Sequence, residues 1–494
     1  MILSRLLAAA GLTAINGDAE ITSLTIDSRR VVPGALFVAI PGLSDDGHDF
    51  IGQAVSGGAA AVLCERADAA PDGVPSAVCE DSRAALARVA AEFFGHPEKK
   101  LRVVGVTGTN GKTSVTYFLS AIWKEAGRQT GVIGTAGASA GDSAIPVAYA
   151  TSTTPDTIEL FEIFAEMVKR GVTDVFMEVT SHALALRKTV GIDFAVGIFT
   201  NLTQDHLDFH GSFENYLAAK TELFRSSAVS VANADDPAFG RISASARGRV
   251  YGYSIDAPSD FRALDAEYSA AGSTFGLSVL GDIYAFRLAI PGRFAVYNAL
   301  AAVAAAIVSG LSVRTAAEGA AELSGVPGRI QPIPNRLGFG VFVDYAHTPD
   351  GLENIIKAAR GFTAGRVITL FGCGGDRDRA KRPIMGRIAG ELSDFAVLTS
   401  DNPRSEDPDA IIDEALAGLA KTGRGYLREP DRRAAIMAAI AMARPGDSVV
   451  IAGKGHENYQ EFENKRRIHF DDAEEAAAAI KALGGGLDDT DVFI

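Results

Sequence analysis

The sequence contains little cysteine. Among its 494 residues only Cys64, Cys79 and Cys373 carry a thiol. Three thiols cannot all form disulfide pairs, and their spacing is not that of metal ligands. A disulfide-stabilised scaffold is therefore excluded, and we expect reduced thiols in a cytoplasmic protein.

Positive charge and long hydrophobic runs are also scarce. The 47 lysines and arginines are outnumbered by 61 acidic residues, which argues against general nucleic-acid binding. The apolar run at 299–308 is too short to span a bilayer. A charge interrupts the apolar start of the chain, which favours an amphipathic helix over a signal peptide. We expect no nucleic-acid or membrane partner, and a monomer. The buried face of the first helix would consist of Ile2, Leu3, Leu6, Leu7 and Ala10.

The order of apolar and polar segments predicts the fold class. The length suggests about three domains, and apolar strands that alternate with helices predict an α/β fold with mostly parallel sheets. We expect a small N-terminal α/β domain at 1–98, a central doubly wound P-loop domain at 99–328 and a Rossmann-like α/β domain at 329–494. A β-rich insert is expected at 250–290. Most of the motifs below follow a strand, where such sheets bind ligands.

A glycine-rich loop is the most informative motif. An apolar strand at 101–106 leads into Gly108-Thr109-Asn110-Gly111-Lys112-Thr113, and a helical pattern follows. Backbone N–H groups at such a helix start bind phosphate. Lys112 would lie against the outer phosphates and the Thr113 hydroxyl on Mg²⁺. Val106 replaces a usual P-loop glycine, and an ordinary strand-to-helix turn is the alternative. We predict a nucleotide site.

Acids and histidines follow the next two strands of this domain. Glu178 suits Mg²⁺, which prefers few carboxylates together with water and phosphate oxygens, although a solvated loop acid is an equal alternative. The loop at 200–210 holds two acids and two histidines in its last six residues. His206 is a plausible metal ligand there, and Asp208 and His210 are weaker candidates. Lys220, in the following helix, reads locally as a solvent-facing lysine.

The last domain carries a different set of loops after strands. Asp344 would hydrogen-bond a ribose hydroxyl or form an Asx turn. Arg377 and Arg404 can bind a carboxylate bidentately, and Glu457 can pair with an ammonium group. Together these loops suit a zwitterionic amino acid, with surface salt bridges as the alternative.

In their order along nearly the whole chain, these motifs resemble the Mur ligase family of peptidoglycan synthesis, and most of all its diaminopimelate-adding members. The resemblance implies that ATP phosphorylates a carboxylate to an acyl phosphate, which an amine then attacks. Its substrates would be UDP-N-acetylmuramoyl-L-alanyl-D-glutamate and meso-diaminopimelate, with ATP and Mg²⁺. The segments that carry it are Asp27-Ser28-Arg29, Gly108 to Thr113, Thr153-Thr154-Pro155, Glu178 to His182, Asn201 to His210, Lys220, Asn298, Asp344 to Pro349, Gly374 to Arg377, Asp401 to Arg404 and Gly453 to Glu457.

The resemblance also implies a role for each matching residue. Lys220 looks like the family's lysine that CO₂ converts to a carbamate (N6-carboxylysine). The implied ATP contacts are Gly108, Thr109, Asn110, Gly111, Lys112, Thr113, Asn298, Arg329 and Asp344. The implied metal ligands are Thr113, Glu178, His206 and Lys220. The implied contacts of the UDP-linked substrate are Ser28, Ser44, Ser152, Thr153, Thr154, Thr180 and Lys188. The implied diaminopimelate contacts are Arg377, Asp401, Asn402, Pro403, Arg404, Gly453 and Glu457.

Arg404 carries the predicted choice of amine. It can bind the distal carboxylate of meso-diaminopimelate, which lysine lacks, and an uncompensated buried charge costs roughly 2–5 kcal/mol. Leu186 and Lys188 depart from the family's glutamine and arginine, and Arg187 could compensate. The alternatives are a lysine-adding relative, the ligase that adds D-alanyl-D-alanine, folylpolyglutamate synthase, or a regulatory P-loop nucleotide switch of another class.

Overall fold

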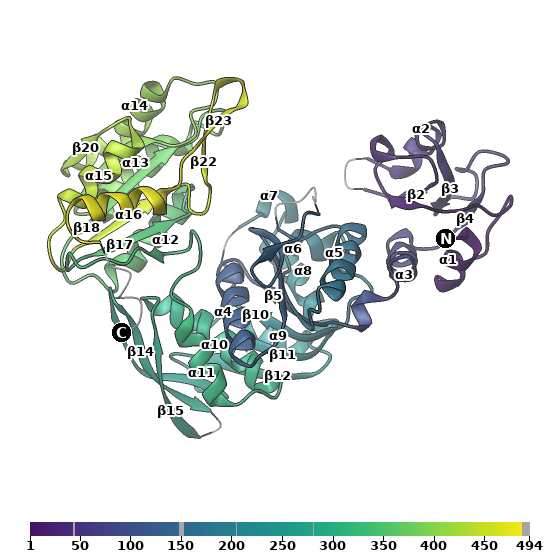
Figure 1. Ribbon diagram of the computed structural model, residues 1–494, viewed down its shortest axis with the longest axis horizontal. Helices are drawn as coiled ribbons and strands as arrows, with labels where there is room; N and C mark the ends of the chain where they lie inside the picture. The colour runs from purple at the N-terminus through teal and green to yellow at the C-terminus, as the bar shows by residue number, and fades with distance from the viewer. Residues whose placement is uncertain (43–44, 148–152, 204, 280, 487–494) are drawn as a thin grey trace. The chain divides into compact units, whose positions relative to one another are not determined.

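The computed structural model describes residues 1–42, 45–147, 153–203, 205–279 and 281–486 (Figure 1). The chain divides into two compact units. One contains 1–253 and 304–312, and the other contains 254–303 and 313–494. Each unit is described by itself below.

The first unit begins with a four-stranded parallel sheet in the order β1-β2-β3-β4. As predicted, the first helix is amphipathic and buries Leu3, Leu6 and Leu7 completely. Ile2 was wrongly assigned to the buried face: it precedes the helix and is 47% exposed. The elements are α1 (Leu3–Ala9), β1 (Ser23–Thr25), a 3₁₀ turn (Ser28–Arg30), β2 (Ala35–Val38), a 3₁₀ turn (Gly47–Phe50), α2 (Ile51–Ser56), β3 (Ala59–Cys64), β4 (Ser76–Val78), α3 (Ser82–Phe94) and a 3₁₀ turn (Pro97–Lys99).

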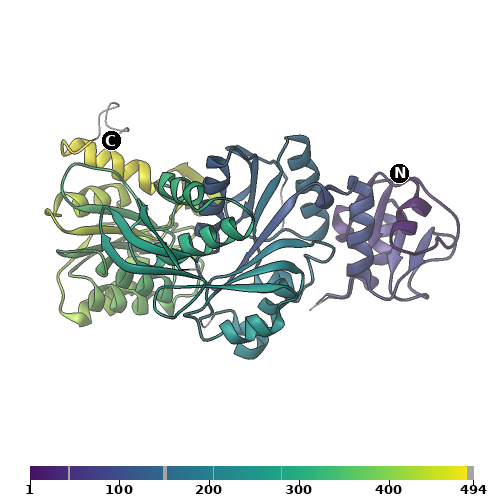
Figure 2. The ribbon, with the colours of Figure 1, turned by 90° about the horizontal axis from the view of Figure 1, so that it is seen from below.

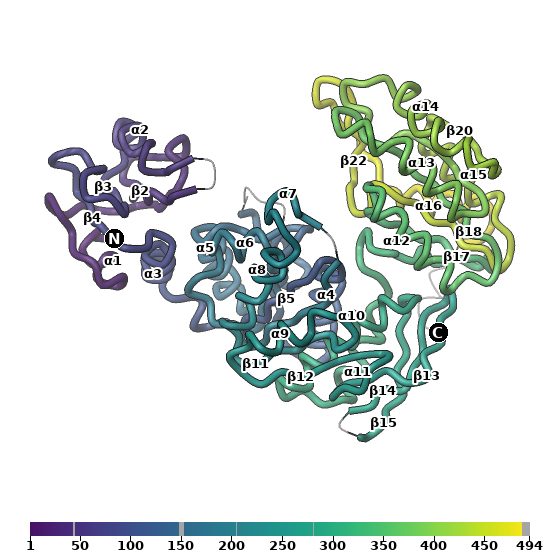
Figure 3. Tube along the Cα trace, turned by 180° about the vertical axis from the view of Figure 1, so that it is seen from behind, coloured from purple at the N-terminus to yellow at the C-terminus, as the bar shows by residue number. Residues whose placement is uncertain are grey.

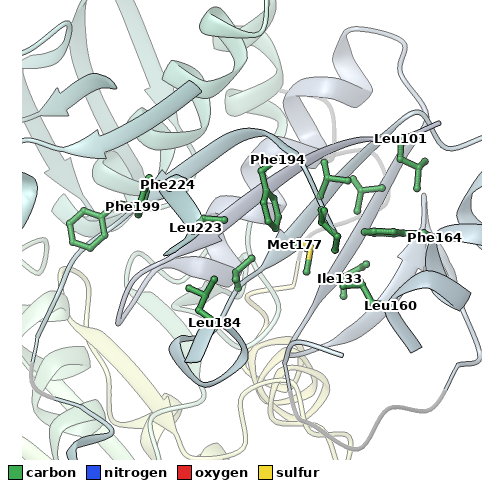
Figure 4. Packing of buried hydrophobic residues seen from close by; sticks show 14 of the residues in the cluster. Leu101, Ile133, Leu160, Phe164, Met177, Leu184, Phe194, Phe199, Leu223 and Phe224 are labelled. Atoms are coloured by element: carbon green, nitrogen blue, oxygen red, sulfur yellow. The ribbon is translucent and has the colours of Figure 1, made fainter. Parts of the chain in front are cut away.

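The same unit continues into a larger sheet with the order β12-β11-β10-β5-β9-β6-β7-β8. Strands β12 to β6 in this order are parallel, and β7 and β8 are antiparallel. An apolar cluster, part of which is drawn in Figure 4, packs strands of this sheet against α5, α6, α8 and α9. The elements are β5 (Arg102–Thr107), α4 (Lys112–Glu125), β6 (Thr130–Gly134), β7 (Gly137–Ala140), β8 (Ser143–Ala144), α5 (Thr157–Lys169), β9 (Asp174–Glu178), α6 (Ser181–Ala185), β10 (Phe194–Phe199), α7 (Leu207–His210), α8 (Phe213–Arg225), β11 (Ser227–Asn233), α9 (Phe239–Ser245) and β12 (Arg249–Ser254).

The second unit opens with the predicted β-rich insert. It consists of β13 (Phe261–Ser269), β14 (Gly272–Val279) and β15 (Asp282–Leu288), which form an antiparallel ribbon, teal to green in Figures 1 and 2. Helix α10 (Arg293–Val308) follows and crosses the division between the units, and α11 (Val313–Glu322) comes next. No helix in the described part of the chain is both long enough and apolar enough to cross a membrane.

The rest of the second unit is a doubly wound sheet with the order β16-β17-β21-β18-β19-β20 (Figures 1 and 3), parallel except for β16. Alternate strand residues pack against α12 to α14 on one face and against α15 and α16 on the other. The elements are β16 (Gln331–Pro332), β17 (Gly340–Asp344), α12 (Pro349–Arg360), β18 (Val367–Cys373), α13 (Lys381–Leu392), β19 (Phe395–Ser400), α14 (Pro408–Leu419), a 3₁₀ turn (Ala420–Thr422), β20 (Tyr426–Arg428), α15 (Arg432–Ala441), β21 (Ser448–Ala452), β22 (Tyr459–Phe462), a 3₁₀ turn (Glu463–Lys465), β23 (Arg466–His469) and α16 (Asp472–Ala482).

These elements confirm the predicted α/β class with mostly parallel sheets. All three cysteines are buried and free.

Candidate active site

The glycine-rich loop connects the end of β5 to the start of α4 (Figure 1). Gly111 is the N-cap of α4 with φ +85°, a left-handed conformation that glycine adopts without strain. The segment after β10 holds the loop in place. Thr200 Oγ1 donates to Asn110 O at 2.6 Å, and the Thr109 N–H donates to Asn201 O at 2.8 Å. The predicted strand, loop and helix are therefore confirmed.

Gly108 is predicted to be irreplaceable in this loop. Its φ is +149°, and a Cβ placed on it would lie 1.8 Å from Thr200 Oγ1, so the loop would have to move. We expect Gly108→Ala to weaken ADP binding at least tenfold in isothermal titration. Gly127→Ala is the matched control, because Gly127 has φ +70° and open space around it. That control should cost about 1 kcal/mol of stability and leave the affinity unchanged; equal affinities for both variants would contradict the assignment.

Glu178 and Thr113 lie side by side, as two ligands of one cation must. Glu178 ends the buried strand β9 and is 2% exposed. The Thr113 hydroxyl donates to Glu178 Oε1 at 2.9 Å, and the Thr135 N–H donates to the same oxygen at 3.0 Å. These are hard oxygen donors with one carboxylate, the set that suits Mg²⁺ completed by water and phosphate. The alternative of a solvated loop acid does not hold, because the carboxylate is buried.

Lys220 is buried rather than solvent-facing. It lies on α8, whose N-cap Ser212 accepts a hydrogen bond from the Asn215 N–H. The side chain is 1% exposed, its ammonium donates to Gly108 O at 2.9 Å, and Nζ lies 4.5 Å from the centre of the Tyr216 ring. Burial, with the charge of Lys112 nearby, lowers the pKa of Lys220 well below its usual range. The prediction of a solvent-facing Lys220 was wrong because the local sequence does not reveal which face of α8 packs on the sheet.

Lys112 folds back over its own loop. Its ammonium donates to Gly108 O at 3.0 Å and to Thr109 O at 2.9 Å. Gly108 O therefore accepts hydrogen bonds from both lysines, which places two lysine side chains at the glycine-rich loop.

The histidines gather beside this loop. His206 precedes α7 with φ +52°, and its side chain is 47% exposed and lies 3.4 Å from Asp205. The rings of His182 and His206 lie 4.7 Å apart. His210 is buried and hydrogen-bonds Ser181 Oγ at 2.9 Å, which is a structural role. No group of three or more His, Cys, Asp or Glu placed to hold a metal ion occurs among the described residues, so any metal site needs other oxygen donors.

The remaining predicted ATP contacts belong to the second unit. Asp344 ends β17, and its Oδ2 accepts from the Ile330 N–H at 2.8 Å. Burial raises the pKa of Asp344, and the adjacent Arg329 guanidinium opposes that shift. Arg329 lies 5.5 Å from the Tyr345 ring centre. The structure thus brings Arg329 and Asp344 together, while Asn298 lies buried on α10.

Three of the predicted substrate threonines surround Glu178. Thr154 Oγ1 donates to Glu178 O at 2.9 Å and contacts Thr180 Oγ1 at 3.3 Å. Thr153 Oγ1 lies 3.2 Å from Thr135 Oγ1. Ser28 begins the 3₁₀ turn after β1, and its hydroxyl donates to Gln53 at 3.0 Å. Ser44 and Ser152 lie outside the described residues.

Lys188 and Arg187 are placed differently from each other. The Lys188 side chain is 8% exposed, and its ammonium lies 3.4 Å from Asp156. Arg187 has φ +56°, is 52% exposed and pairs with Asp81 at 2.7 Å. Of the two, Arg187 carries the accessible charge. Contact of Lys188 with the substrate remains a prediction.

The predicted amine-binding loops after β19 and β21 are joined by hydrogen bonds. Asn402 Nδ2 donates to Glu457 Oε2 at 2.9 Å. Gly453 has φ +127°, and a Cβ there would lie 2.8 Å from Asp401 Oδ2. Asp401, Asn402 and Pro403 are buried, so this loop has a fixed shape.

The loop after β18 contacts the loop after β19 through Gly375. Arg404 has φ +51°, and its Nη1 donates to Gly375 O at 2.7 Å. The Gly375 N–H donates to Asn402 O at 2.9 Å. Arg377 is exposed and contacts the Asp376 carbonyl.

Sequence reasoning missed Lys454 and Glu461. Lys454 is completely buried, and its ammonium donates to Asn402 Oδ1 at 3.0 Å and to Glu457 Oε2 at 3.4 Å. Its position two residues after the buried strand β21, between two glycines, was the available signal. Glu461 accepts from Arg404, and its local sequence gives no indication of that contact.

Comparison with known proteins identifies three matching segments. Residues 20–99 match "Mur ligase family, catalytic domain", 106–306 match "Mur ligase middle domain" and 328–455 match "Mur ligase, glutamate ligase domain". The UDP-N-acetylmuramoyl-L-alanyl-D-glutamate–2,6-diaminopimelate ligase of Clostridium tetani is 44% identical over 95% of this chain and 97% of its own. Its counterpart from Solibacter usitatus is 45% identical over 94% of each chain.

Solved structures agree with these matches. A UDP-N-acetylmuramoyl-L-alanyl-D-glutamate–2,6-diaminopimelate ligase is 34% identical with a TM-score of 0.72, over 94% of this chain and 95% of that one. The MurF ligase of Thermotoga maritima in complex with ADP shares the fold at 20% identity and a TM-score of 0.57, over 93% of this chain and 97% of that one. The matched segments and the near-complete coverage show that this chain belongs to the Mur ligase family.

Proposed function

We propose that this chain is an ATP-dependent ligase that joins meso-2,6-diaminopimelate to the D-glutamate of UDP-N-acetylmuramoyl-L-alanyl-D-glutamate, and that it works in the cytoplasm. The observation that carries the proposal is the 44% identity to the Clostridium tetani ligase over 95% of this chain. The hydrogen bonds of Lys112 and Lys220 to Gly108 O, and of Thr113 to Glu178, support it.

The reaction requires two like-charged groups to meet. A carboxylate oxygen of the substrate attacks the γ-phosphorus of ATP, the bond to ADP breaks, and an acyl phosphate forms. The amine nitrogen then attacks the acyl carbon, phosphate leaves, and the nitrogen loses a proton. Because phosphoryl transfer depends on positioning and charge neutralisation, the ammonium of Lys112 and the N-terminus of α4 provide what the first step needs.

Mg²⁺ would be held by Thr113, Glu178, His206 and a modified Lys220. Bound there, it would neutralise phosphate charge. Thr113 and Glu178 already touch, and the Thr135 N–H helps to fix the carboxylate.

Lys220 is proposed to carry a carbamate. A neutral amine nitrogen attacks CO₂, a nitrogen–carbon bond forms, and one proton is released. The burial that lowers the pKa of Lys220 favours the neutral amine that this reaction needs.

The three predicted domains would divide the substrates among them. Residues 1–98 would hold the UDP end with Ser28 and Ser44. Residues 99–328 would bind ATP and, through Ser152, Thr153, Thr154, Thr180 and Lys188, the rest of that substrate. Residues 329–494 would bind the amine through Arg377, the Asp401 to Arg404 loop, Gly453 and Glu457. Arg329 and Asp344 would contact ATP together with Asn298.

An amino-acid panel tests the proposal directly. Phosphate release by the purified protein should require ATP, the UDP-linked dipeptide and meso-diaminopimelate together. L-lysine should be a poor substitute, because it lacks the distal carboxylate that Arg404 would bind. Equal turnover with both amines would contradict the specificity, and preference for L-lysine would favour a lysine-adding enzyme. Phosphate release without any amine or UDP-linked substrate would indicate a nucleotide switch.

A further inference from the structure

A carboxylate of the protein itself lies against the arginine that is proposed to select the amine. Arg404 Nε donates to Glu461 Oε1 at 3.2 Å, while Nη1 donates to Gly375 O at 2.7 Å. The side chains of Arg404 and Glu461 are 21% and 13% exposed, respectively. This pair is therefore only partly exposed to solvent.

The backbone holds Glu461 in this position. The Arg404 N–H donates to Glu461 O at 3.0 Å, and the Glu461 N–H donates to Asn402 Oδ1 at 2.9 Å. Arg404 also forms a parallel bridge with Phe462. The β22–β23 hairpin is thus anchored to the loop after β19, and Glu461 is presented to Arg404 from a fixed strand.

A second guanidinium lies on the other side of the carboxylate. Arg467 on β23 contacts Glu461 Oε2 at 2.7 Å and is 56% exposed. The hydrogen bond from Arg467 and the charges of both arginines hold the pKa of Glu461 below its usual range. Glu461 is consequently an anion between two cations at neutral pH.

We propose that Glu461 is a positioning residue that determines specificity: it supplies Arg404 with a carboxylate partner when the amine substrate brings none. It thereby sets how strictly the site demands a second carboxylate on that substrate. This inference rests on the proposed function, because it assumes that Arg404 meets the distal end of the amine.

Two electrostatic effects follow from this arrangement. With lysine bound, Arg404 keeps Glu461 as a counter-charge, so the mismatch costs less than an orphaned guanidinium would. With diaminopimelate bound, the distal carboxylate approaches an arginine that already has an anion beside it, and the two carboxylates repel. Both effects reduce the preference for diaminopimelate over lysine, so removing the charge of Glu461 should increase that preference.

Glu461→Gln tests this directly, because glutamine has the same shape and keeps an oxygen that can accept from Arg404. The quantity measured is kcat/KM for meso-diaminopimelate divided by kcat/KM for L-lysine. We expect this ratio to rise about fivefold, which is the size that a partly exposed ion pair supports. Most of the change should be a lower kcat/KM for L-lysine, while the KM values for ATP and the UDP-linked substrate stay unchanged. A structural defect would instead lower kcat/KM for both amines in parallel, and the ratio would stay the same.

Arg467→Gln is the second variant and should act in the opposite direction. Without Arg467, the charge of Glu461 is shared only with Arg404, so the ratio should fall. A ratio that stays at the wild-type value in both variants, or that falls in Glu461→Gln, overturns the role of Glu461 while leaving the proposed function intact. A wild-type protein that uses neither amine overturns the proposed function, and this inference with it.

Discussion

Replacing Lys220 with alanine is expected to lower the rate of phosphate release by about 10²–10³-fold, the range for removing one preorganised polar group from a catalytic site. Lys220 is buried, and its nitrogen reaches the carbonyl of Gly108 in the phosphate loop. A carbamate there would add negative charge that helps to hold the proposed Mg²⁺, and alanine cannot. The assay is phosphate release at saturating substrates, together with ADP binding to show that the loop still forms.

Two controls separate a carbamate from a structural lysine. Lys169→Ala removes a lysine whose side chain is 73% exposed, and it should leave the rate unchanged. Added acetate should partly restore Lys220→Ala, because it returns a carboxylate to the cavity left by the side chain. Wild-type protein in ¹³C-bicarbonate should show a carbamate carbon signal that Lys220→Ala lacks. Full activity in Lys220→Ala would rule out a catalytic role for the carbamate.

The largest loss of stability is expected from the ion pair between Arg432 and Asp472, which join α15 to α16. Both side chains are completely buried, and Arg432 Nη2 lies 2.6 Å from Asp472 Oδ2. Asp472→Asn leaves a buried guanidinium without its anion, which costs about 3–5 kcal/mol. For a unit of this size the Tm should fall by between about 6 and 20 °C in a thermal scan.

A neighbouring pair provides the matched control. Arg433 and Glu475 lie 2.6 Å apart between the same two helices, but Arg433 is 66% exposed. Glu475→Gln should therefore cost less than about 1 kcal/mol. Replacing both buried partners, in Arg432→Met with Asp472→Leu, should recover most of the loss because no charge is left unpaired. Equal melting temperatures for Asp472→Asn and Glu475→Gln would contradict this account.

The phosphate loop was predictable because its determinants are local. Gly108 and Gly111 need unusual φ values, and the strand before them and the helix after them are contiguous in sequence. The apolar pattern likewise predicted the parallel sheets, since strands buried on both faces are continuously hydrophobic. The assignment of Ile2 to the buried face was wrong because a residue at a helix end can lie outside the helix and its periodic face.

The candidate site was less predictable where contacts are distant in sequence. Lys220 reaches Gly108 across 112 positions, and Arg404 reaches Glu461 across 57. Local patterns cannot report such pairs, because strand order and helix packing create them. Resemblance to the family identified Lys220 but not Lys454 or Glu461, whose roles are visible only as contacts.

The hydroxyl of Thr113 is oriented before any ligand binds. Its proton is directed at Glu178 Oε1, so its lone pairs remain for a cation while the proton stays in place. Folding has therefore already restricted the rotation of this hydroxyl before any ligand arrives, and the entropy of that restriction does not have to be lost again on binding. A serine at this position would keep the oxygen but rotate more freely about χ1. The β-methyl group of one residue thus helps the site to be ready in advance of its ligands.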